Sequence, residues 1–446
     1  MDDFRKLLSA SLGEDVAARV LDALEEKPEV SIRLNPSKPA TLDFETGNPV
    51  PWNEDAFFLT GRPVFTADPL FHGGAYYVQD SSAMFPAKVF MDILPSVAPE
   101  NGTLRVLDLC AAPGGKTTGV LSVLSKSDIK DYLLVANEIS SSRVTVLCEN
   151  VARWGNPSAV VTSVDPAAFS SLDGYFDVIL ADVPCSGEGM FRKDAEARAQ
   201  WSLQNVSLCQ GRQRRILSDA WKALRQGGVL IYSTCTFNHL ENDDNAGWIA
   251  ETLGGEMLEI DAPYAETLKT RYGCALVPGF ARGEGQYCAA IVKTAPGQYR
   301  HKNEKKARGV GETVKNVWLE GDGISIVRRN NLFVGLTAAL AKEQEALAPL
   351  RPLRSGIAVG ELKGKDMVPH ADLALAGCLL PDAFARLELD RERALAFLQR
   401  ETLYTPEAPK GYLLVTYKGV ALGFVKNLGT RCNNLLPAGR RIRIEV

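Results

Sequence analysis

Short apolar runs alternate with helix-like segments between residues 104 and 235, and this alternation constrains the fold more than any other feature of the chain. The runs are LRVLDLC (104–110), YLLVANE (132–138), SAVVTSVD (158–165), FDVILADVP (176–184) and GGVLIYSTC (227–235). Such runs are typical of strands that are buried on both faces of a parallel sheet. The segments between them, 116–126, 140–153 and 204–225, have the spacing of amphipathic helices. We therefore predict a doubly wound, Rossmann-like α/β core whose ligand crevice lies at the carboxyl ends of the strands.

The segments on either side of this core predict further domains, as expected for a chain of 446 residues. Apolar residues at three and four spacing predict one helix over 2–26, and the Pro- and Gly-punctuated stretch 35–74 predicts a small α+β unit. After the core, 326–336 and 356–364 are β-rich around a helix near 338–348. From about 372 a helical stretch precedes the alternating strands of a compact β-barrel-like module.

These features divide the chain into five predicted parts. They are an N-terminal α+β segment (1–98), the α/β core (99–295), a polar linker (296–312), a second α+β unit (313–371) and the C-terminal module (372–446).

The net charge of −4 conceals an uneven distribution of charged residues. Residues 1–290 carry 25 Lys and Arg against 38 Asp and Glu, whereas 291–446 carry 25 against 16. A basic C-terminal third suits a phosphate-rich partner, although a solvated basic surface explains the same charge.

Composition also excludes several classes of protein. The N-terminus has no charged leader before an apolar core and no run of about 18 apolar residues occurs, so we predict a cytoplasmic protein without a membrane partner. The nine cysteines are scattered singly and only four histidines are present, which favours reduced thiols and no metal site. We expect a monomer, because a large partner needs no second protomer.

The first motif is DLCAAPGGKT (108–117), which follows a predicted strand and opens a predicted helix. Its glycines let backbone N–H groups approach a ligand, and the helix N-terminus favours a negative group such as a carboxylate. A phosphate loop would need a glycine where Cys110 stands, and no dinucleotide fingerprint is present. A purely structural tight turn is the alternative.

Two acidic residues follow the next strands. Glu138 stands at the end of the second strand, where an acidic residue accepts hydrogen bonds from ribose hydroxyls in dinucleotide-type folds. Asp165 follows the third strand, near the expected position of an adenine amine. Alternatively, Glu138 is a charge that stabilises a helix N-terminus, and Asp165 is an ordinary loop aspartate.

Two cysteines follow the last two strands, in DVPCSGEGMFRKD (182–194) and STCT (233–236). Cys185 and Cys235 can therefore face one crevice beside Asp182. A free cysteine is most often a buried small apolar residue, but two of them at adjacent strand ends point to chemistry.

These groups suit methylation of cytosine carbon 5, which is a poor nucleophile. A thiolate that adds to carbon 6 makes carbon 5 reactive, and this is covalent catalysis. A free thiol is mostly protonated at neutral pH, so a nearby cation would help, and Lys193 is a candidate. Asp182 suits the ring nitrogen and exocyclic amine, and the second thiol could assist product release.

Together DLCAAPGGKTT, NEISSSR (137–143), DVPCSGEGMFRKD and YSTCTFNHLEND resemble the Fmu/Sun family of RNA (cytosine-5) methyltransferases, in the layout of bacterial members that act on small-subunit ribosomal RNA. SIRLNP (31–36) and YYVQDSSAM (76–84) are similar to the family's N-terminal RNA-binding segment, and 411–443 resembles its PUA-like RNA-binding end. The resemblance covers nearly the whole chain and implies RNA, with ribosomal RNA or the small ribosomal subunit as the partner.

The resemblance also implies roles for individual residues. Cys235 becomes the nucleophile, and Cys185 aids product release. The cofactor, S-adenosyl-L-methionine, would be contacted by Ala111, Ala112, Pro113, Gly114, Gly115, Lys116, Thr117, Glu138, Arg143, Asp165 and Asp182. Val183 stands where the family usually has alanine, and Asn433 stands where lysine is expected; the first should alter packing and the second RNA contacts. The target cytosine should be flipped into the crevice.

Other functions remain open at this stage. A DNA cytosine-5 methyltransferase would use the Pro-Cys thiol as nucleophile, and a tRNA methyltransferase would share the chemistry proposed above. A non-catalytic ribosome-assembly factor would keep the fold without binding S-adenosylmethionine. A small-molecule methyltransferase would not need the basic C-terminal third.

Overall fold

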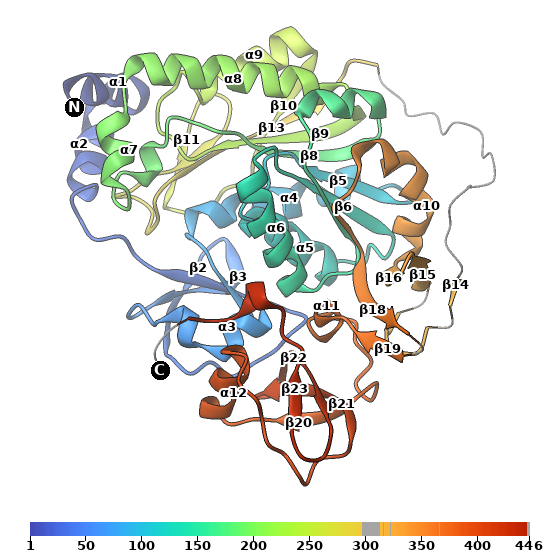
Figure 1. The fold of residues 1–446 in the computed structure, drawn as a ribbon. Coiled ribbons are helices and arrows are strands. Elements are labelled where there is room, and N and C mark those ends of the chain that lie inside the picture. The colour runs from blue at the N-terminus through green and yellow to red at the C-terminus, as the bar shows by residue number, and fades with distance from the viewer. Residues whose placement is uncertain (297–312, 315, 322, 365, 444–446) are drawn as a thin grey trace.

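The computed structural model of the chain describes residues 1–296, 313–314, 316–321, 323–364 and 366–443. Its centre is a ten-stranded mixed sheet (Figure 1). The strands lie in the order β11 (Thr267–Lys269), β12 (Cys274–Leu276), β13 (Gln286–Lys293), β9 (Leu224–Thr234), β8 (Phe176–Asp182), β5 (Leu104–Asp108), β6 (Tyr132–Asn137), β7 (Ala159–Thr162) and β17 (Arg354–Ser355), with β10 (Gly255–Leu258) paired to β13. The five runs predicted as parallel strands are β5 to β9, and they pair in parallel. The Rossmann-like core is therefore confirmed.

Antiparallel strands that no sequence pattern predicted extend this sheet at both edges. β13 pairs with β9, β12 and β11 follow it, and β17 pairs with β7 from the segment that follows α10 (Ala338–Leu347). Three of these strands are two or three residues long, too short for a period of two to be recognised.

Successive side chains of the parallel strands point to opposite faces of the sheet and build two apolar layers. Val106 and Leu134 pack in one layer, and Leu107 and Val135 pack in the other. The first layer is covered by α4 (Phe85–Val97), α5 (Gly115–Lys126) and α6 (Ser141–Trp154). The second layer is covered by η3 (Pro166–Leu172), α8 (Leu203–Trp221), α9 (Asp243–Leu253) and α10. The sheet therefore holds its strand ends in a fixed position between helices.

The N-terminal segment forms two helices, so the single helix predicted over 2–26 was wrong. They are α1 (Asp2–Leu12) and α2 (Glu14–Ala23). Gly13 between them has φ 85°, in the left-handed region, and this interrupts the helix. Phe4 and Val20 pack into the second apolar layer of the core.

The predicted N-terminal α+β unit is a four-stranded antiparallel sheet. Its strands lie in the order β2 (Thr46–Val50), β3 (Asn53–Leu59), β1 (Ser31–Leu34) and β4 (Tyr76–Val78), with η1 (Phe65–Ala67), α3 (Pro69–Gly73) and η2 (Ser82–Met84). Pro69 at the first turn and the Asp68 side chain, which accepts from the Leu70 N–H, start α3.

The C-terminal part contains two further sheets. The first has the order β14 (Thr313–Val314), β15 (Ser325–Arg329), β16 (Leu332–Leu336), β18 (Ile357–Lys363) and β19 (Asp366–Pro369), with η5 (Ala348–Leu350) and α11 (Ala371–Ala374) nearby in sequence. The second has the order β20 (Ala385–Glu388), β21 (Gly411–Tyr417), β22 (Val420–Asn427) and β23 (Cys432–Asn434), with α12 (Arg391–Leu398) and η6 (Ala438–Arg440). Of the predicted linker, 297–312 lies outside the described residues.

The C-terminal sheet packs back onto the N-terminal one. Ile32 and Leu70 share an apolar cluster with Leu413 and Val425. In consequence the segment from η6 to Arg443 returns against α3 and α6 (Figure 1). Within the described residues, no helix is both long and apolar enough to cross a membrane.

Candidate active site

The two predicted cysteines meet at the carboxyl ends of neighbouring strands. Cys185 lies three residues after β8 and Cys235 directly follows β9, and these strands are paired in parallel up to Asp182 and Ser233. The two Sγ atoms are 3.1 Å apart, and both side chains are partly buried. Gly189 also donates its backbone N–H to the Cys235 carbonyl, at 2.8 Å, which ties the two loops together.

An ion pair lies at the same strand end. Lys116 Nζ is 2.9 Å from Asp182 Oδ2, and Asp182 Oδ1 accepts from Ser233 at 2.9 Å and from Gln286 at 3.0 Å. Burial lowers the pKa of Lys116, but the Asp182 carboxylate outweighs it and, with smaller contributions from Cys235 and Cys288, leaves the pKa above its ordinary value. Lys116 is therefore a permanent cation between the cofactor loop and the thiols.

Lys193, the cation predicted to assist the thiol, lies among carboxylates. Its Nζ lies 3.7 Å from Asp80 and 3.6 Å from Glu284, so its charge is shared with two carboxylates. Lys116, which was predicted only as a cofactor contact, is the cation that Cys235 influences electrostatically.

The Cys185 thiol is held in its protonated form. Its hydrogen bond with Cys235, its burial and the charge of Cys235 raise the pKa of Cys185 well above the ordinary value. A neutral Cys185 can donate its proton to the sulfur of Cys235.

The predicted cofactor loop turns between β5 and α5. Gly114 has φ 110°, a conformation that glycine adopts without strain, and the Ala111 N–H donates to the Asn137 carbonyl at 2.8 Å. Thr117 donates to Asp108 Oδ2 at 2.5 Å, while Asp108 Oδ1 is buried without a hydrogen-bond partner among the described residues. Burial raises the pKa of Asp108 to about 7.

The acidic residues after β6 and β7 differ in their surroundings. Glu138 is buried, accepts from the Ser140 N–H at 2.9 Å, and lies 3.4 Å from Arg143. Arg143 in turn donates to the Ala112 carbonyl at 2.7 Å, so it braces the loop. Asp165 caps η3 by accepting from the Ala167 N–H at 3.0 Å, and it is partly exposed.

These residues fit S-adenosylmethionine, a molecule with a cationic amino group, a carboxylate, ribose hydroxyls and a sulfonium methyl. The free acceptor at Asp108 suits a cationic amino group, and the buried Glu138 carboxylate suits hydroxyl donors. Backbone N–H groups at the start of α5 suit a carboxylate. The loop and the strand ends therefore carry the acceptors and donors that this cofactor needs.

Two supporting residues were missed from the sequence. Arg33 of β1 is fully buried and donates to the Gly115 carbonyl at 3.1 Å and to Thr118 Oγ1 at 2.6 Å, so the N-terminal sheet holds the cofactor loop. Gln286 of β13 reaches Asp182. The SIRLNP segment was the only sequence pattern that pointed to Arg33. Gln286 could not be predicted, because strand β13 was not predicted.

A buried polar network under Cys185 was also missed. Glu241 accepts from the Ser186 N–H at 3.0 Å, from Gln213 at 2.7 Å and from Asn238 at 3.0 Å. Burial raises the pKa of Glu241 despite these donors. Glu188, at the start of η4 (Glu188–Met190), accepts from two successive backbone N–H groups after Cys235, those of Phe237 and Asn238. In the sequence, the acidic and amide residues of NHLEND (238–243) were the pattern from which this network could have been predicted.

Val183, which stands where the family usually has alanine, lies in the packed core. Val183 is 3% exposed and joins the second apolar layer with Ala181. In the described part of the chain, no group of three or more His, Cys, Asp or Glu residues is arranged to hold a metal ion.

The Rossmann-like sheet, the glycine loop at its strand ends and the buried acceptors beside it define an S-adenosylmethionine-dependent methyltransferase. Residues 95–292 match the family described as 16S rRNA methyltransferase RsmB/F, 2–81 the N-terminal domain of 16S rRNA methyltransferase RsmF, and 384–442 the methyltransferase RsmF PUA domain. The chain belongs to the RsmF family of ribosomal RNA small subunit methyltransferases.

Individual relatives agree with this assignment. The ribosomal RNA small subunit methyltransferase F of Shewanella loihica is 33% identical over 441 residues, which cover 91% of this chain and 88% of the relative. The protein of the same name from Escherichia coli O157:H7 is 32% identical and covers 91% and 89%. A solved methyltransferase homolog from Pyrococcus horikoshii has a TM-score of 0.52 and 27% identity, over 64% of this chain and 92% of that one.

Proposed function

We propose that this enzyme methylates carbon 5 of a cytosine in 16S ribosomal RNA and that Cys235 is its covalent nucleophile. One observation carries the assignment of the chemistry: two thiols 3.1 Å apart, beside the Lys116–Asp182 ion pair. The substrate is supported by the relatives, which are named as ribosomal RNA small subunit methyltransferases. A tRNA substrate is the second candidate, because the same residues would serve it.

The reaction begins when the Cys235 sulfur adds to carbon 6 of the cytosine. A sulfur–carbon bond forms, and the electron pair of the carbon 5–carbon 6 double bond makes carbon 5 nucleophilic. S-adenosylmethionine supplies the methyl group as an electrophilic sulfonium substituent. The proton on carbon 5 then passes to a water molecule, and its electron pair restores the double bond and expels the Cys235 thiolate.

Cys185 is proposed to help Cys235 leave. Since the raised pKa of Cys185 keeps its proton in place, this thiol can donate to the departing Cys235 sulfur. A protonated Cys185 is a poor nucleophile, which favours Cys235 as the attacking group.

Asp182 and Lys116 are proposed to control charge around the ring. The Asp182 carboxylate can accept from the exocyclic amine or a protonated ring nitrogen, which stabilises the cytosine as the thiolate adds. Lys116 pairs with Asp182 and adds positive charge near Cys235. Lys193 is then proposed to position Glu284 and Asp80 around the crevice.

The remaining cofactor roles, the domain boundaries, the oligomeric state and the location of the enzyme are also proposals. Ala111 to Thr117, Glu138, Arg143 and Asp165 would contact the cofactor. One chain supplies both thiols and the cofactor loop, which supports a monomer. The nine cysteines are all free thiols, which supports a reducing cytoplasm.

Cysteine variants test the nucleophile. Cys235→Ser should abolish methyl transfer to 16S RNA, and Cys185→Ala should leave covalent protein–RNA adducts that survive denaturing electrophoresis. Cys148→Ala, in α6, removes a thiol away from the site and should behave as wild type. If Cys185→Ser abolishes attack and Cys235→Ala traps the adduct, the two roles are reversed.

Bisulfite sequencing of RNA from a strain lacking the protein identifies the modified cytosine.

A further inference from the structure

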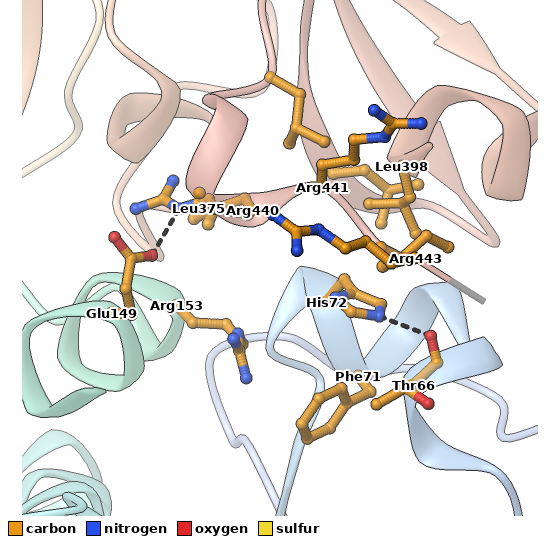
Figure 2. Close-up of a pocket in the computed structure, with 14 residues that line it drawn as sticks. Thr66, Phe71, His72, Glu149, Arg153, Leu375, Leu398, Arg440, Arg441 and Arg443 are labelled. Carbon is orange, nitrogen blue, oxygen red and sulfur yellow. Dashed lines mark hydrogen bonds and ion pairs between the residues drawn. The ribbon is translucent and has the colours of Figure 1, made fainter. Parts of the chain in front are cut away.

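A cavity of about 430 Å³ lies where α3, α6 and the end of the chain meet, apart from the thiols and the cofactor loop (Figure 2). Four arginines line it: Arg153 from α6, and Arg440, Arg441 and Arg443 from the C-terminal segment. Leucines and Ile442 form an apolar floor, and Phe71 and His72 of α3 complete the wall. Because its walls come from three distant parts of the sequence, the cavity exists only when these parts are packed together.

The positive charge in this cavity is poorly compensated. Glu149 is the only acidic residue of the lining, and it is paired with Arg440 at 2.7 Å. The Arg153 guanidinium lies 4.8 Å from the centre of the Phe71 ring, with no hydrogen bond or ion pair to the described residues. Arg440 pairs with Asp372 as well, yet its Nη1 atom is buried without a hydrogen-bond partner in the described part of the chain. Buried donors of this kind indicate a missing acceptor.

Two neighbouring basic groups, Lys38 and His72, are affected by the arginines. Burial and the charges of Arg153 and Arg440 lower the pKa of Lys38, which lies behind the cavity wall, to about 7. Burial lowers the pKa of His72 to about 4, and Arg153 contributes to the shift. An anion in the cavity would relieve this repulsion.

A smaller, aromatic cavity of about 210 Å³ adjoins the first one and shares Phe71 and Arg153 with it. Phe65, Phe71 and Tyr77 are its partly exposed aromatic residues, and the buried Tyr76 and Trp154 lie beneath them. Asn150, also in its wall, donates to the Pro113 carbonyl of the cofactor loop at 2.8 Å. Arginines followed by aromatic rings form the kind of surface on which a single nucleic-acid strand places its phosphates and bases.

We propose that this arginine pocket binds a backbone phosphate of single-stranded RNA that extends from the target cytosine, an inference that rests on the proposed function. Arginine forks match phosphate oxygens in bidentate geometry, and four of them converge here from two elements. The apolar floor and the aromatic cavity fit the sugar and base of the same strand, which a free phosphate ion would leave unfilled. Binding would clamp the C-terminal domain onto the methyltransferase core.

The salt dependence of RNA binding tests the pocket. A short fluorescein-labelled single-stranded RNA is titrated with the full chain at several salt concentrations, for wild type, Arg153→Gln, Arg443→Gln and the double variant. Loss of the phosphate contact in the double variant should make the plot of log affinity against log salt less steep by about 0.7. Arg153→Lys should keep the slope, because it keeps the charge. Unchanged affinity and slope in the double variant would overturn the proposal.

Two controls sharpen the test. Lys342→Gln removes one positive charge from an exposed position of α10 and should leave the slope unchanged. Inorganic phosphate is titrated at constant ionic strength, and stabilisation of wild type by phosphate alone as strongly as by RNA would identify a small-anion site and overturn the RNA assignment. Melting temperatures identify any variant that has not folded, and Arg443→Gln, at an exposed position, then serves in place of Arg153→Gln.

The same experiment separates this proposal from the proposed function. A wild-type enzyme that binds RNA through the arginines but transfers no methyl group contradicts the cytosine chemistry alone. A wild-type enzyme that methylates RNA while the arginine variants bind and react normally contradicts the pocket alone.

Discussion

Lys116 Nζ lies 2.9 Å from Asp182 Oδ2 and joins the glycine loop after β5 to the end of β8, three residues before Cys185. The lysine belongs to the first turn of α5, whereas the aspartate ends β8. The ion pair therefore links the two halves of the site and fixes the Asp182 carboxylate against a residue of the glycine loop.

We expect Lys116→Gln to lower kcat for methyl transfer by about 100-fold, the scale found when one preorganised charge is removed from an active site. Asp182 would keep its hydrogen bonds from Ser233 and Gln286, so the fold should persist. Transfer of a radiolabelled methyl group under saturating RNA measures the change. Lys222→Gln, at an exposed position after α8, is the matched control. An unchanged kcat would show that the ion pair has no part in the chemistry.

Asp108 predicts a pH dependence of stability. Burial raises its pKa to about 7 from an ordinary value of 3.8, so between these values the native state holds a proton that the unfolded chain has released. The free energy of unfolding therefore falls as the pH rises through this window, by roughly 1.4 kcal/mol for each unit, and is level above it.

Asp108→Asn removes this titration. The melting temperature of the variant minus that of wild type should therefore increase from pH 4 to pH 7. Affinity of wild type for S-adenosylmethionine should rise over the same range, because only the ionised carboxylate attracts a cationic amino group. Asp128→Asn, at an exposed position, should track wild type at every pH. A constant difference in melting temperature between Asp108→Asn and wild type would contradict the assignment.

The parallel core and the meeting of the two thiols could be predicted from the sequence. Buried parallel strands have long apolar runs, and their carboxyl ends lie at the same edge of the sheet. The sequence did not indicate that Lys116 would pair with Asp182. Lys193 is closer to Cys185 along the chain, but Lys116 meets Asp182 because α5 begins at the end of the adjacent strand β5. Gln286 and Arg33 reach the site from β13 and β1, whose positions depend on tertiary packing that no local pattern records.

Glu241→Gln should loosen the loop that carries Cys185. All the groups that approach this carboxylate are donors, from Ser186, Gln213 and Asn238, so an amide NH₂ would face a donor and leave it unsatisfied. We expect a loss of about 1–3 kcal/mol in the free energy of unfolding by urea. Since Glu241 positions Cys185, release of product should also slow, and adducts should accumulate. Glu251→Gln, exposed on α9, should leave stability and adduct level unchanged; equal effects of the two variants would refute the positioning role.

The distance between the thiols predicts sensitivity to oxidation. The Sγ atoms are 3.1 Å apart, and a disulfide needs about 2.05 Å, so a movement of about 1 Å joins them. The diazene oxidant diamide would take two electrons and two protons from the pair and become a hydrazine, leaving a Cys185–Cys235 disulfide and an inactive enzyme. The rate should increase with pH, because the thiolate is the reacting form and the contact with Cys235 and burial keep the pKa of Cys185 high. Mass spectrometry of tryptic peptides should find the two cysteines linked, and dithiothreitol should restore activity. Oxidised enzyme in which both thiols still react with iodoacetamide would contradict this prediction.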